Sequence, residues 1–284
     1  MSGAEATNEA SNWVALREDD GRAYLVNNVP GEVKIKGLGR FDPSTLLEGF
    51  SLGDRITVGQ KSLTIVEAAL PEARRNMNRR AQTIGIKDSG FLISWMGIGA
   101  GSRVLEGGHG SAGLAMNLAN VMSSEGCLIS VENRPEHAEV GRGNMERMAD
   151  FSAEFPSWKL LEMDLQNAAS EVFAICGELD AAIIDIAEPW TVVSEISQTL
   201  RIGGRIACYC PTTAQLEKSW NKVEEDGLVV EFAGEIIERR WAKAGRGGYT
   251  GSNANVGNGG DQEQLVQMIT ERVMSALASQ KATA

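Results

Sequence analysis

A glycine-rich turn between two apolar segments is the sequence feature that most restricts how this chain can fold. Residues 103–113 read Arg-Val-Leu-Glu-Gly-Gly-His-Gly-Ser-Ala-Gly, and an apolar series at residues 114–121 follows directly. This pattern predicts a short strand, a loop and the N-terminus of a buried helix. Glycines let backbone N–H groups approach a ligand closely, and the helix dipole favours negative charge at that end. The segment is therefore typical of a site for a nucleotide-like cofactor.

Two classes of cofactor are compatible with this turn. Residues 108–113 spell G-x-G-x-x-G, the dinucleotide fingerprint, and Glu132 lies at a suitable distance downstream to bind a ribose hydroxyl. Glu106 separates the two classes, because a carboxylate at the strand end would repel a pyrophosphate but suits an ammonium and a sulfonium. We therefore expect S-adenosylmethionine, with a nicotinamide dinucleotide or an unliganded structural turn as alternatives.

Composition limits the class of protein. The 284 residues are 43% hydrophobic, which is enough for one large core or two modest ones. There is no apolar run near the roughly 20 residues of a membrane helix, and residues 1–11 lack a signal-peptide pattern, so we expect a soluble cytoplasmic protein without membrane contact. A net charge of −11 argues against indiscriminate nucleic-acid binding but permits local basic clusters, here at residues 74–80 and 239–246.

The four cysteines show no metal-ligand spacing. Cys127, Cys176, Cys208 and Cys210 contain no CxxC pair, so the sequence predicts neither a zinc site nor a disulfide framework. We expect small buried side chains. Cys208 and Cys210 would share one face of a strand, where they are too strained to bridge each other.

The order of patterns predicts several segments. Residues 1–12 are expected to be disordered, and residues 13–70 alternate short β-like runs with turns, which predicts a small β-barrel or sandwich. Helical patterns follow at residues 73–80 and 88–96. Beyond Gly113, a helix pattern at residues 135–148 and apolar runs that end in acidic residues or a turn predict a mostly parallel sheet with ligands at its carboxyl ends. These runs are residues 127–131, 158–163, 181–184 and 205–210.

The C-terminal region has a different composition. Residues 228–237 could supply a further strand, whereas residues 245–260 form a Gly/Asn-rich linker that cannot bury a core. Residues 261–284 carry the spacing of an amphipathic helix. The predicted domains are thus a β-domain at 13–70, a cofactor-binding domain at 71–244, and this linker and helix.

Three motifs together resemble the TrmI-type tRNA (adenine-N1) methyltransferases, which modify adenosine 58 of the T-loop. They are Arg-Ala-Gln-Thr-Ile-Gly-Ile-Lys-Asp at 80–88, Val-Leu-Glu-Gly-Gly-His-Gly-Ser-Ala-Gly-Leu at 104–114 and Asp-Ile-Ala-Glu-Pro-Trp at 185–190. The resemblance covers about residues 46–241. It implies an α/β fold: a class I, Rossmann-like methyltransferase domain preceded by a small N-terminal β-barrel-like domain. It also implies a homotetramer, with a dimer as the alternative, and tRNA as partner.

The resemblance also implies roles for individual residues. Asp185 would be the catalytic carboxylate, accepting from the adenine amine and stabilising the charge that develops on the ring. Pro189 and Trp190 would line the base pocket, and no metal is needed. Arginines would hold the tRNA backbone: Arg79, Arg80, Arg239 and Arg240. The implied cofactor residues are Gln82, Glu106, Gly108, Gly110, Ser111, Ala112, Gly113, Leu114, Glu132, His137, Asp164, Leu165 and Asp185.

The chain departs from the family pattern at two places. Gly85 stands where the family commonly has a tyrosine that stacks on the target adenine, and the usual closing strand with its His-Thr signature is replaced by the Gly/Asn-rich stretch and helix. Two alternatives to the enzyme therefore stay open. One is a non-catalytic tRNA-binding subunit of the same fold, and the other is a class I methyltransferase with a different substrate.

Overall fold

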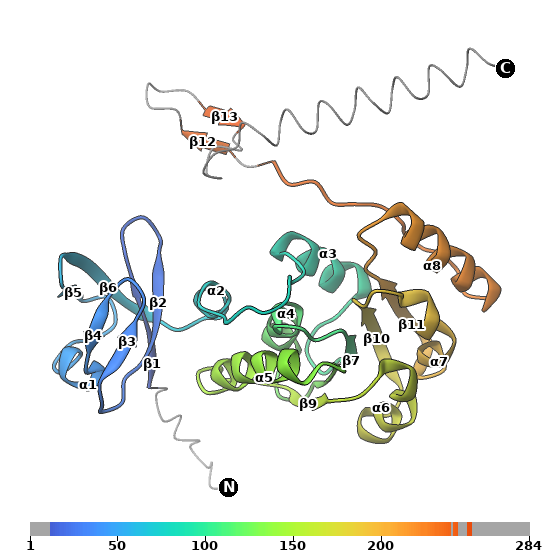
Figure 1. Ribbon diagram of the computed structural model, residues 1–284, viewed down its shortest axis with the longest axis horizontal. Helices are drawn as coiled ribbons and strands as arrows, with labels where there is room; N and C mark the ends of the chain where they lie inside the picture. Colours follow the sequence, from blue (N-terminus) through green and yellow to red (C-terminus); the bar gives the residue numbers. More distant parts are fainter. Residues whose placement is uncertain (1–11, 240, 244–248, 252–284) are drawn as a thin grey trace, which may run out of the picture. The chain divides into compact units, whose positions relative to one another are not determined.

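The computed structural model describes residues 12–239, 241–243 and 249–251 and divides the chain into two compact units, Met1–Ala233 and Gly234–Ala284 (Figure 1). Nearly all of the predicted disordered start and the predicted linker, and the whole of the predicted C-terminal helix, lie outside the described residues.

The first part of unit one is β-structure. Strands β1 (Trp13–Arg17), β2 (Ala23–Asn27), β5 (Arg55–Val58) and β6 (Lys61–Glu67) form an antiparallel sheet of order β2-β1-β6-β5. Its core is apolar and includes the fully buried Leu16 and Leu63. Strands β3 (Val33–Ile35) and β4 (Gly39–Phe41) pair only with each other, and the short helix α1 (Pro43–Leu46) is N-capped by Asp42. Because this hairpin bridges neither edge of the larger sheet, a closed barrel is not confirmed for the described part of this region.

The rest of unit one is built on a parallel sheet. Strands β7 (Arg103–Gly107), β8 (Cys127–Val131), β9 (Ser157–Leu161), β10 (Leu179–Ile184) and β11 (Leu200–Cys208) lie in the order β11-β10-β7-β8-β9, and every pair is parallel. The predicted parallel sheet is therefore confirmed. The chain moves outward from β7 through β8 to β9 and then returns to the other side of β7, so the topological switch point lies between β7 and β10. Open α/β sheets bind ligands at such a point.

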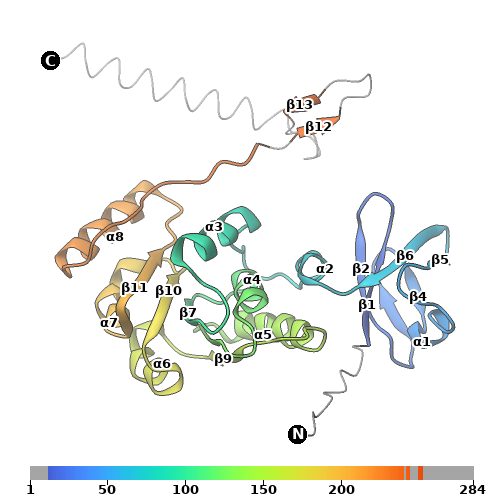
Figure 2. The same cartoon turned by 180° about the vertical axis from the view of Figure 1, so that it is seen from behind.

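Helices cover both faces of this sheet (Figures 1 and 2). Successive strand residues point to opposite faces, so Val104 belongs to one hydrophobic core and Leu105 to the other. The first core includes α3 (Ile86–Met96), α4 (Gly113–Met122) and α5 (Pro135–Ala149), and the second includes α6 (Ala169–Cys176) and α7 (Val193–Ser197). No helix that the structure describes is long and apolar enough to cross a membrane. The remaining helices are α2 (Leu70–Arg75), α8 (Thr213–Glu225), η1 (Leu165–Asn167) and η2 (Pro189–Val192).

Two predicted elements differ from the structure. The helix predicted at residues 73–80 ends at Arg75, because the following backbone donors bond to side chains of other elements instead of to a helical turn. No strand forms at residues 228–237, so β11 is the last strand of the parallel sheet in the described chain. Strands β12 (Trp241–Lys243) and β13 (Tyr249–Gly251) pair with each other in the second unit.

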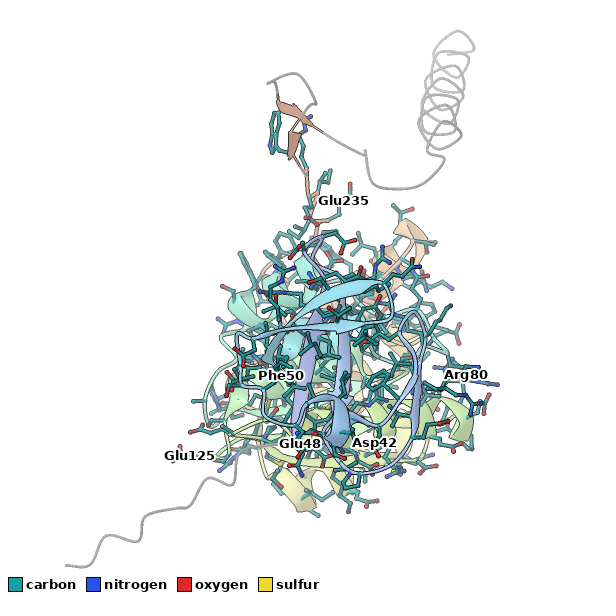
Figure 3. The ribbon with its side chains drawn as sticks, turned by 90° about the vertical axis from the view of Figure 1, so that its left-hand side faces the viewer. Asp42, Glu48, Phe50, Arg80, Glu125 and Glu235 are labelled. Carbon is teal, nitrogen blue, oxygen red and sulfur yellow. A yellow bond between two sulfur atoms is a disulfide. The ribbon has the colours of Figure 1, made fainter. Side chains whose placement is uncertain are left out.

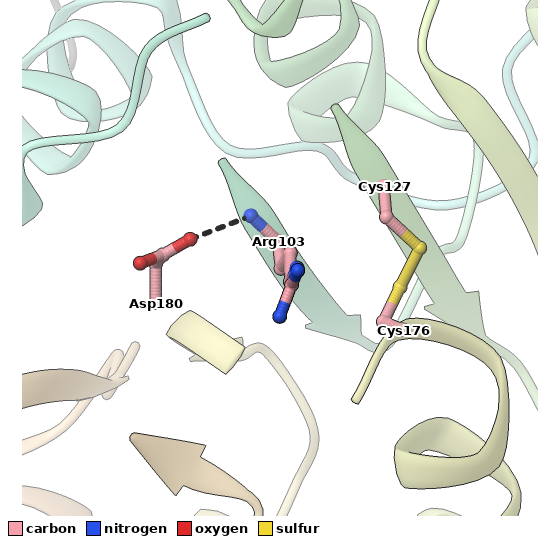
Figure 4. The surroundings of a disulfide bond; sticks show 4 residues. All are labelled: Arg103, Cys127, Cys176 and Asp180. Atoms are coloured by element: carbon pink, nitrogen blue, oxygen red, sulfur yellow. Dashed lines mark hydrogen bonds between the residues drawn. A yellow bond between two sulfur atoms is a disulfide. The ribbon is translucent and has the colours of Figure 1, made fainter. Parts of the chain in front are cut away.

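The prediction that cysteines form no disulfide is wrong. Cys127 begins β8, Cys176 ends α6, and the two are bonded with Cα atoms 6.0 Å apart (Figure 4). They lie 49 positions apart in the sequence, so no local spacing reveals the pair; the βαβ crossover brings them together. Nearby, the Arg103 N–H donates to Asp180 at 2.8 Å and joins the starts of β7 and β10. Cys208 and Cys210 are free, as expected.

Candidate active site

The glycine-rich turn presents bare backbone at the switch point. Gly108 has a φ of 90°, and a Cβ there would lie 2.0 Å from the carbonyl oxygen of Asp185, so only glycine fits. The N–H groups of Gly108 and His109 both donate to the Val131 carbonyl, at 2.9 and 3.1 Å. Ala112 caps α4 with a φ of 64°, unusual for a residue with a side chain. The predicted turn is thus a tight cradle that leads directly into a helix N-terminus.

Glu106 is buried beneath this cradle. Its exposed fraction is 1%, and its Oε2 atom accepts from the Ser130 hydroxyl at 2.7 Å and lies 2.8 Å from His109 Nδ1. Trp158 in turn donates to Ser130 Oγ at 3.1 Å. His109 Nε2 is buried without a hydrogen-bond partner. Glu106 is therefore at the strand end as predicted, but at least one of its oxygens bonds to protein groups.

Glu132 lies at the end of the neighbouring strand, β8. Its carboxylate accepts from the Gly110 N–H at 2.9 Å and from Arg134 through the backbone N–H, Nε and Nη2. Burial acts to raise the pKa of Glu132, but the hydrogen bonds from Arg134 and Gly110 outweigh it and hold this pKa below its usual value. Glu132 therefore carries a negative charge directly beneath the turn. The Arg134 guanidinium donates to the same carboxylate oxygens that could accept hydrogen bonds from a ribose diol.

Asp185 follows β10 directly across the switch point. Its N–H donates to the Gly107 carbonyl at 2.7 Å, which fixes the backbone of the two strand ends together. Burial, and then the negative charge of Glu106, raise the pKa of Asp185 to about 6, against the opposing effect of Arg134. Carboxyl groups with raised pKa values are common at functional sites, so Asp185, which lies beside the glycine-rich turn, is a candidate functional group.

Tyr209, which the sequence analysis did not identify as a site residue, lies near Gly85, where the side chain is missing. A Cβ added to Gly85 would lie 3.7 Å from Asp88 Oδ2, and the Tyr209 hydroxyl donates to that same oxygen at 3.3 Å. The Tyr209 N–H bonds to the Ile184 carbonyl, so the residue stands beside the end of β10. Burial and the charge of Asp88 raise the pKa of Tyr209 above its usual value, and Asp185 adds to this effect. The signal in the sequence was its place within the predicted strand run at residues 205–210, and in the structure it directly follows β11, which ends at Cys208.

Other predicted cofactor residues surround the turn. Leu165 packs against Gly107, where a Cβ would lie 2.3 Å from its side chain, and Asp164 accepts from Asn133 at 2.7 Å. Gln82 is exposed next to the Ala81 that contacts Gly110. His137 lies in the first turn of α5, with a buried Nδ1 that has no hydrogen-bond partner. The structure brings together the residues that follow β7, β8, β9 and β10 at one edge of the sheet.

The predicted substrate residues are only partly assembled. Pro189 is buried and Trp190 half-buried in η2, and the Lys218 ammonium lies 4.5 Å from the Trp190 ring centroid. Arg79 and Arg80 are exposed, and Figure 3 shows Arg80 at the surface. Arg239 is exposed but belongs to the second unit, and Arg240 lies outside the described residues. Sequence reasoning also missed His109 and Arg134, for which no motif gave a signal.

The donor set fits S-adenosylmethionine. The glycines bring the backbone of the turn directly against Asp185 and Leu165 at the strand ends, and Glu132 supplies the acceptor that a ribose needs. Glu106, Glu132 and Asp185 concentrate negative charge, which suits a cationic cofactor and opposes a pyrophosphate.

Comparison with known proteins gives a consistent result. A family model described as the tRNA methyltransferase complex GCD14 subunit matches residues 68–271. The tRNA (adenine(57)-N(1)/adenine(58)-N(1))-methyltransferase TrmI of Methanocaldococcus jannaschii is 29% identical over 244 residues, or 79% of this chain and 84% of that protein. The tRNA (adenine(58)-N(1))-methyltransferase TrmI of Thermus thermophilus is 28% identical over 227 residues, covering 80% and 86% of the two chains.

Solved structures agree on the fold. A SAM-dependent O-methyltransferase from Thermotoga maritima superposes with a TM-score of 0.67 at 23% identity, over 89% of this chain and 91% of that one. The tRNA (m1A58) methyltransferase TrmI from Aquifex aeolicus gives 0.62 at 20% identity, over 87% and 93%. The α/β region thus has the class I, Rossmann-like methyltransferase fold.

Proposed function

Because the chain belongs to the family of the GCD14 subunit of the tRNA methyltransferase complex, we propose that it transfers a methyl group from S-adenosylmethionine to N1 of adenosine 58 in tRNA. The observation that carries this proposal is the contact between Gly108 and the Asp185 backbone at the switch point. It puts a half-buried carboxyl group next to a cofactor cradle. A neighbouring adenosine is a second target to be tested, since the Methanocaldococcus jannaschii relative is named for both positions.

The chain's own residues would hold the cofactor at the edge of the sheet. When bound, S-adenosylmethionine supplies an electrophilic methyl group on a sulfonium. Glu132 would accept hydrogen bonds from the ribose hydroxyls, which would replace hydrogen bonds that Arg134 now donates to the same carboxylate. The turn at residues 110–114 would face the methionine end of the cofactor, with Gln82 nearby. Asp164, His137 and the backbone at Leu165 would line the adenine side. Glu106 would contribute its charge from below.

Asp185 would act on the target base. As a carboxylate it accepts from the exocyclic amine of adenine and thereby points N1 toward the cofactor. Bound S-adenosylmethionine would supply the methyl group that N1 takes up, and the adenine ring would become cationic. The negative charge of Asp185 stabilises this developing positive charge without having to remove a proton from N1.

We assign the missing aromatic face to Tyr209. Its hydroxyl is held by Asp88, the residue that also adjoins Gly85, so its ring stands beside the space that a side chain at position 85 would occupy. Base stacking is sequence-tolerant and typically contributes ~1–3 kcal/mol per base. Pro189 and Trp190 would form the opposite wall of the pocket.

The partner proposed is tRNA, held by basic side chains around the site. Arg79 and Arg80 are exposed near the turn, and Lys218 lies over the Trp190 ring. For Arg239 and Arg240, contact with tRNA stays a prediction from the sequence. We also propose the domain boundaries given above, a homotetramer or dimer, and a cytoplasmic location, where tRNA is modified.

Incubation with unmodified tRNA and methyl-labelled S-adenosylmethionine tests the proposed reaction. We expect label in the tRNA with the wild-type protein, and a rate of labelling lower by roughly 100-fold or more with Asp185→Ala. A folded, cofactor-binding protein that transfers no label would contradict the proposal.

The glycine at position 85, where the family commonly has a tyrosine that stacks on the target adenine, favours one second candidate function. This candidate is a non-catalytic tRNA-binding subunit of the same fold. Calorimetry with S-adenosylmethionine separates the two, because a scaffold has no need of a cofactor site. The enzyme requires binding, whereas tRNA binding without cofactor binding would identify the scaffold.

A further inference from the structure

A ten-residue arm, residues 76–85, connects α2 to α3 without helix or strand (Figure 1). Met77 and Ile84 anchor it in the core with 8% and 3% exposure, whereas Arg79 and Arg80 between them are exposed. Since no ladder or helical turn holds this backbone, its position depends on hydrogen bonds from other elements.

Ser111 of the glycine-rich turn supplies the first of these bonds. Its hydroxyl is fully buried, and its Oγ atom accepts from the N–H groups of Arg80 and Ala81 at 3.0 and 3.1 Å. Ser111 therefore belongs to the cofactor turn through its backbone and to the arm through its side chain.

Asn144 of α5 joins the same two segments a second time. Its amide Nδ2 donates to the Asn78 carbonyl at 2.8 Å and to the Ser111 carbonyl at 3.0 Å, and its Oδ1 accepts from the Asn78 N–H at 2.9 Å. The side chain is 2% exposed. An unmade hydrogen bond in such a buried place is costly, so these bonds favour the arrangement in which the arm is docked on the turn.

Close packing completes the connection. A Cβ on Gly113 would lie 2.4 Å from Thr83 Cβ, and one on Gly110 would lie 3.3 Å from Ala81 Cβ. Arg74 of α2 donates to the carbonyls of both Ile84 and Gly113. The arm thus lies directly on the turn, with no room for a side chain between them.

We propose that Ser111 and Asn144 are positioning residues that couple the RNA-binding arm to the cofactor turn, so that cofactor and tRNA each raise the affinity for the other. The inference rests on the proposed function. An arm docked on Ser111 presents Arg79 and Arg80 in one place, and a turn that is ordered by cofactor presents Ser111 in one place. Each ligand therefore favours the same docked state, and linkage requires the two effects to be equal.

Equilibrium binding of S-adenosylhomocysteine and of an unmodified tRNA transcript measures this coupling. We expect each to tighten the binding of the other by the same factor, on the order of tenfold, within the range typical of allosteric coupling. With Ser111→Ala or Asn144→Ala, we expect the factor to fall to within about twofold of one, as the arm then moves independently.

Asn117→Ala is the matched control, since Asn117 of α4 donates at the loop end to the Gly113 carbonyl rather than to the arm. It should weaken cofactor binding and leave the coupling factor in place. Wild-type protein that binds both ligands without mutual effect would overturn the inference, as would both variants keeping the full factor. A wild-type protein that binds neither ligand would instead contradict the proposed function. Should Ser111→Ala not fold, Asn144→Ala and the wild-type coupling still decide the question.

Discussion

Asp185, the proposed catalytic carboxylate, has a pKa that the folded structure raises well above its usual value. Its pKa rises to about 6 because the carboxyl is buried and then because Glu106 lies nearby. The folded state therefore holds a proton more tightly than the unfolded state. This cost to stability is fully present above about pH 6 and disappears as the pH falls below 3.8, the usual pKa of an aspartate.

The first prediction concerns pH and stability at this residue. Asp185→Asn removes the buried charge, and at 1.36 kcal/mol per pKa unit it should raise the free energy of unfolding at pH 8 by about 2–3 kcal/mol. The same substitution should give no gain near pH 3.5. Urea unfolding at the two pH values measures this difference. An equal effect at both would show that the carboxyl is not destabilised by ionisation.

The pH dependence of methyl transfer gives a second prediction. Because the ionised form holds the adenine amine, kcat/KM should rise with pH through about 6, tenfold per unit below that value, and level off above it. Asp185→Asn should abolish this inflection along with most of the activity. A wild-type profile that is flat from pH 5 to 8 would remove Asp185 from the proposed role.

Tyr209 carries the third prediction at this scale. Tyr209→Phe keeps the ring and loses only the hydrogen bond to Asp88, so we expect less than a tenfold loss in kcat/KM. Tyr209→Leu removes the stacking face and should lower kcat/KM by about 5–150-fold, from the ~1–3 kcal/mol typical of stacking. S-adenosylhomocysteine affinity serves as the control and should stay unchanged in both. Equal losses in the two variants would assign Tyr209 to structure rather than to the base.

At the scale of elements, α5 offers a matched pair of glycines. A Cβ on Gly141 would lie 2.4 Å from His109 Cδ2, whereas a Cβ on Gly143 meets nothing within 4 Å. Gly141→Ala must therefore displace His109 and its contact with Glu106, at a cost of about 1–3 kcal/mol in stability. Gly143→Ala should instead stabilise the helix by about 0.5–1 kcal/mol. Denaturant midpoints test the pair, and two variants of similar stability would contradict the packing described.

Elements show what sequence patterns can predict. The runs of the N-terminal β-region and the parallel strands ending in Glu132, Asp164 and Asp185 were predictable, because alternation and acidic strand ends are local signals. The end of α2 at Arg75 was not predictable. The helical pattern continues to residue 80, but the backbone after Arg75 donates hydrogen bonds to Ser111 and Asn144 instead of forming a further helical turn. His109 likewise sits in a glycine motif that gives no sign of its contact with Glu106.

At the scale of the whole molecule, the disulfide is a contact between distant parts of the sequence. Closing a loop of 49 residues restricts the unfolded chain by about 4 kcal/mol in the entropic model. We predict that reduction lowers the free energy of unfolding by about 2–4 kcal/mol in the wild type and by nothing in Cys176→Ser. Cys208→Ser is the control and should keep the effect. Thiol titration should find two free thiols before reduction and four after it.

The molecule as a whole brings its candidate groups to the switch point, where methylation of adenosine 58 is proposed to occur. Two tRNA transcripts, one natural and one with adenosine 58 replaced by guanosine, are incubated with the protein and S-adenosylmethionine, and their nucleosides are measured by mass spectrometry. We expect 1-methyladenosine in the natural transcript and a large loss of it in the substituted one, with any remainder mapping to the neighbouring adenosine. Absence of 1-methyladenosine from both, with a folded protein that binds the cofactor, would contradict this expectation.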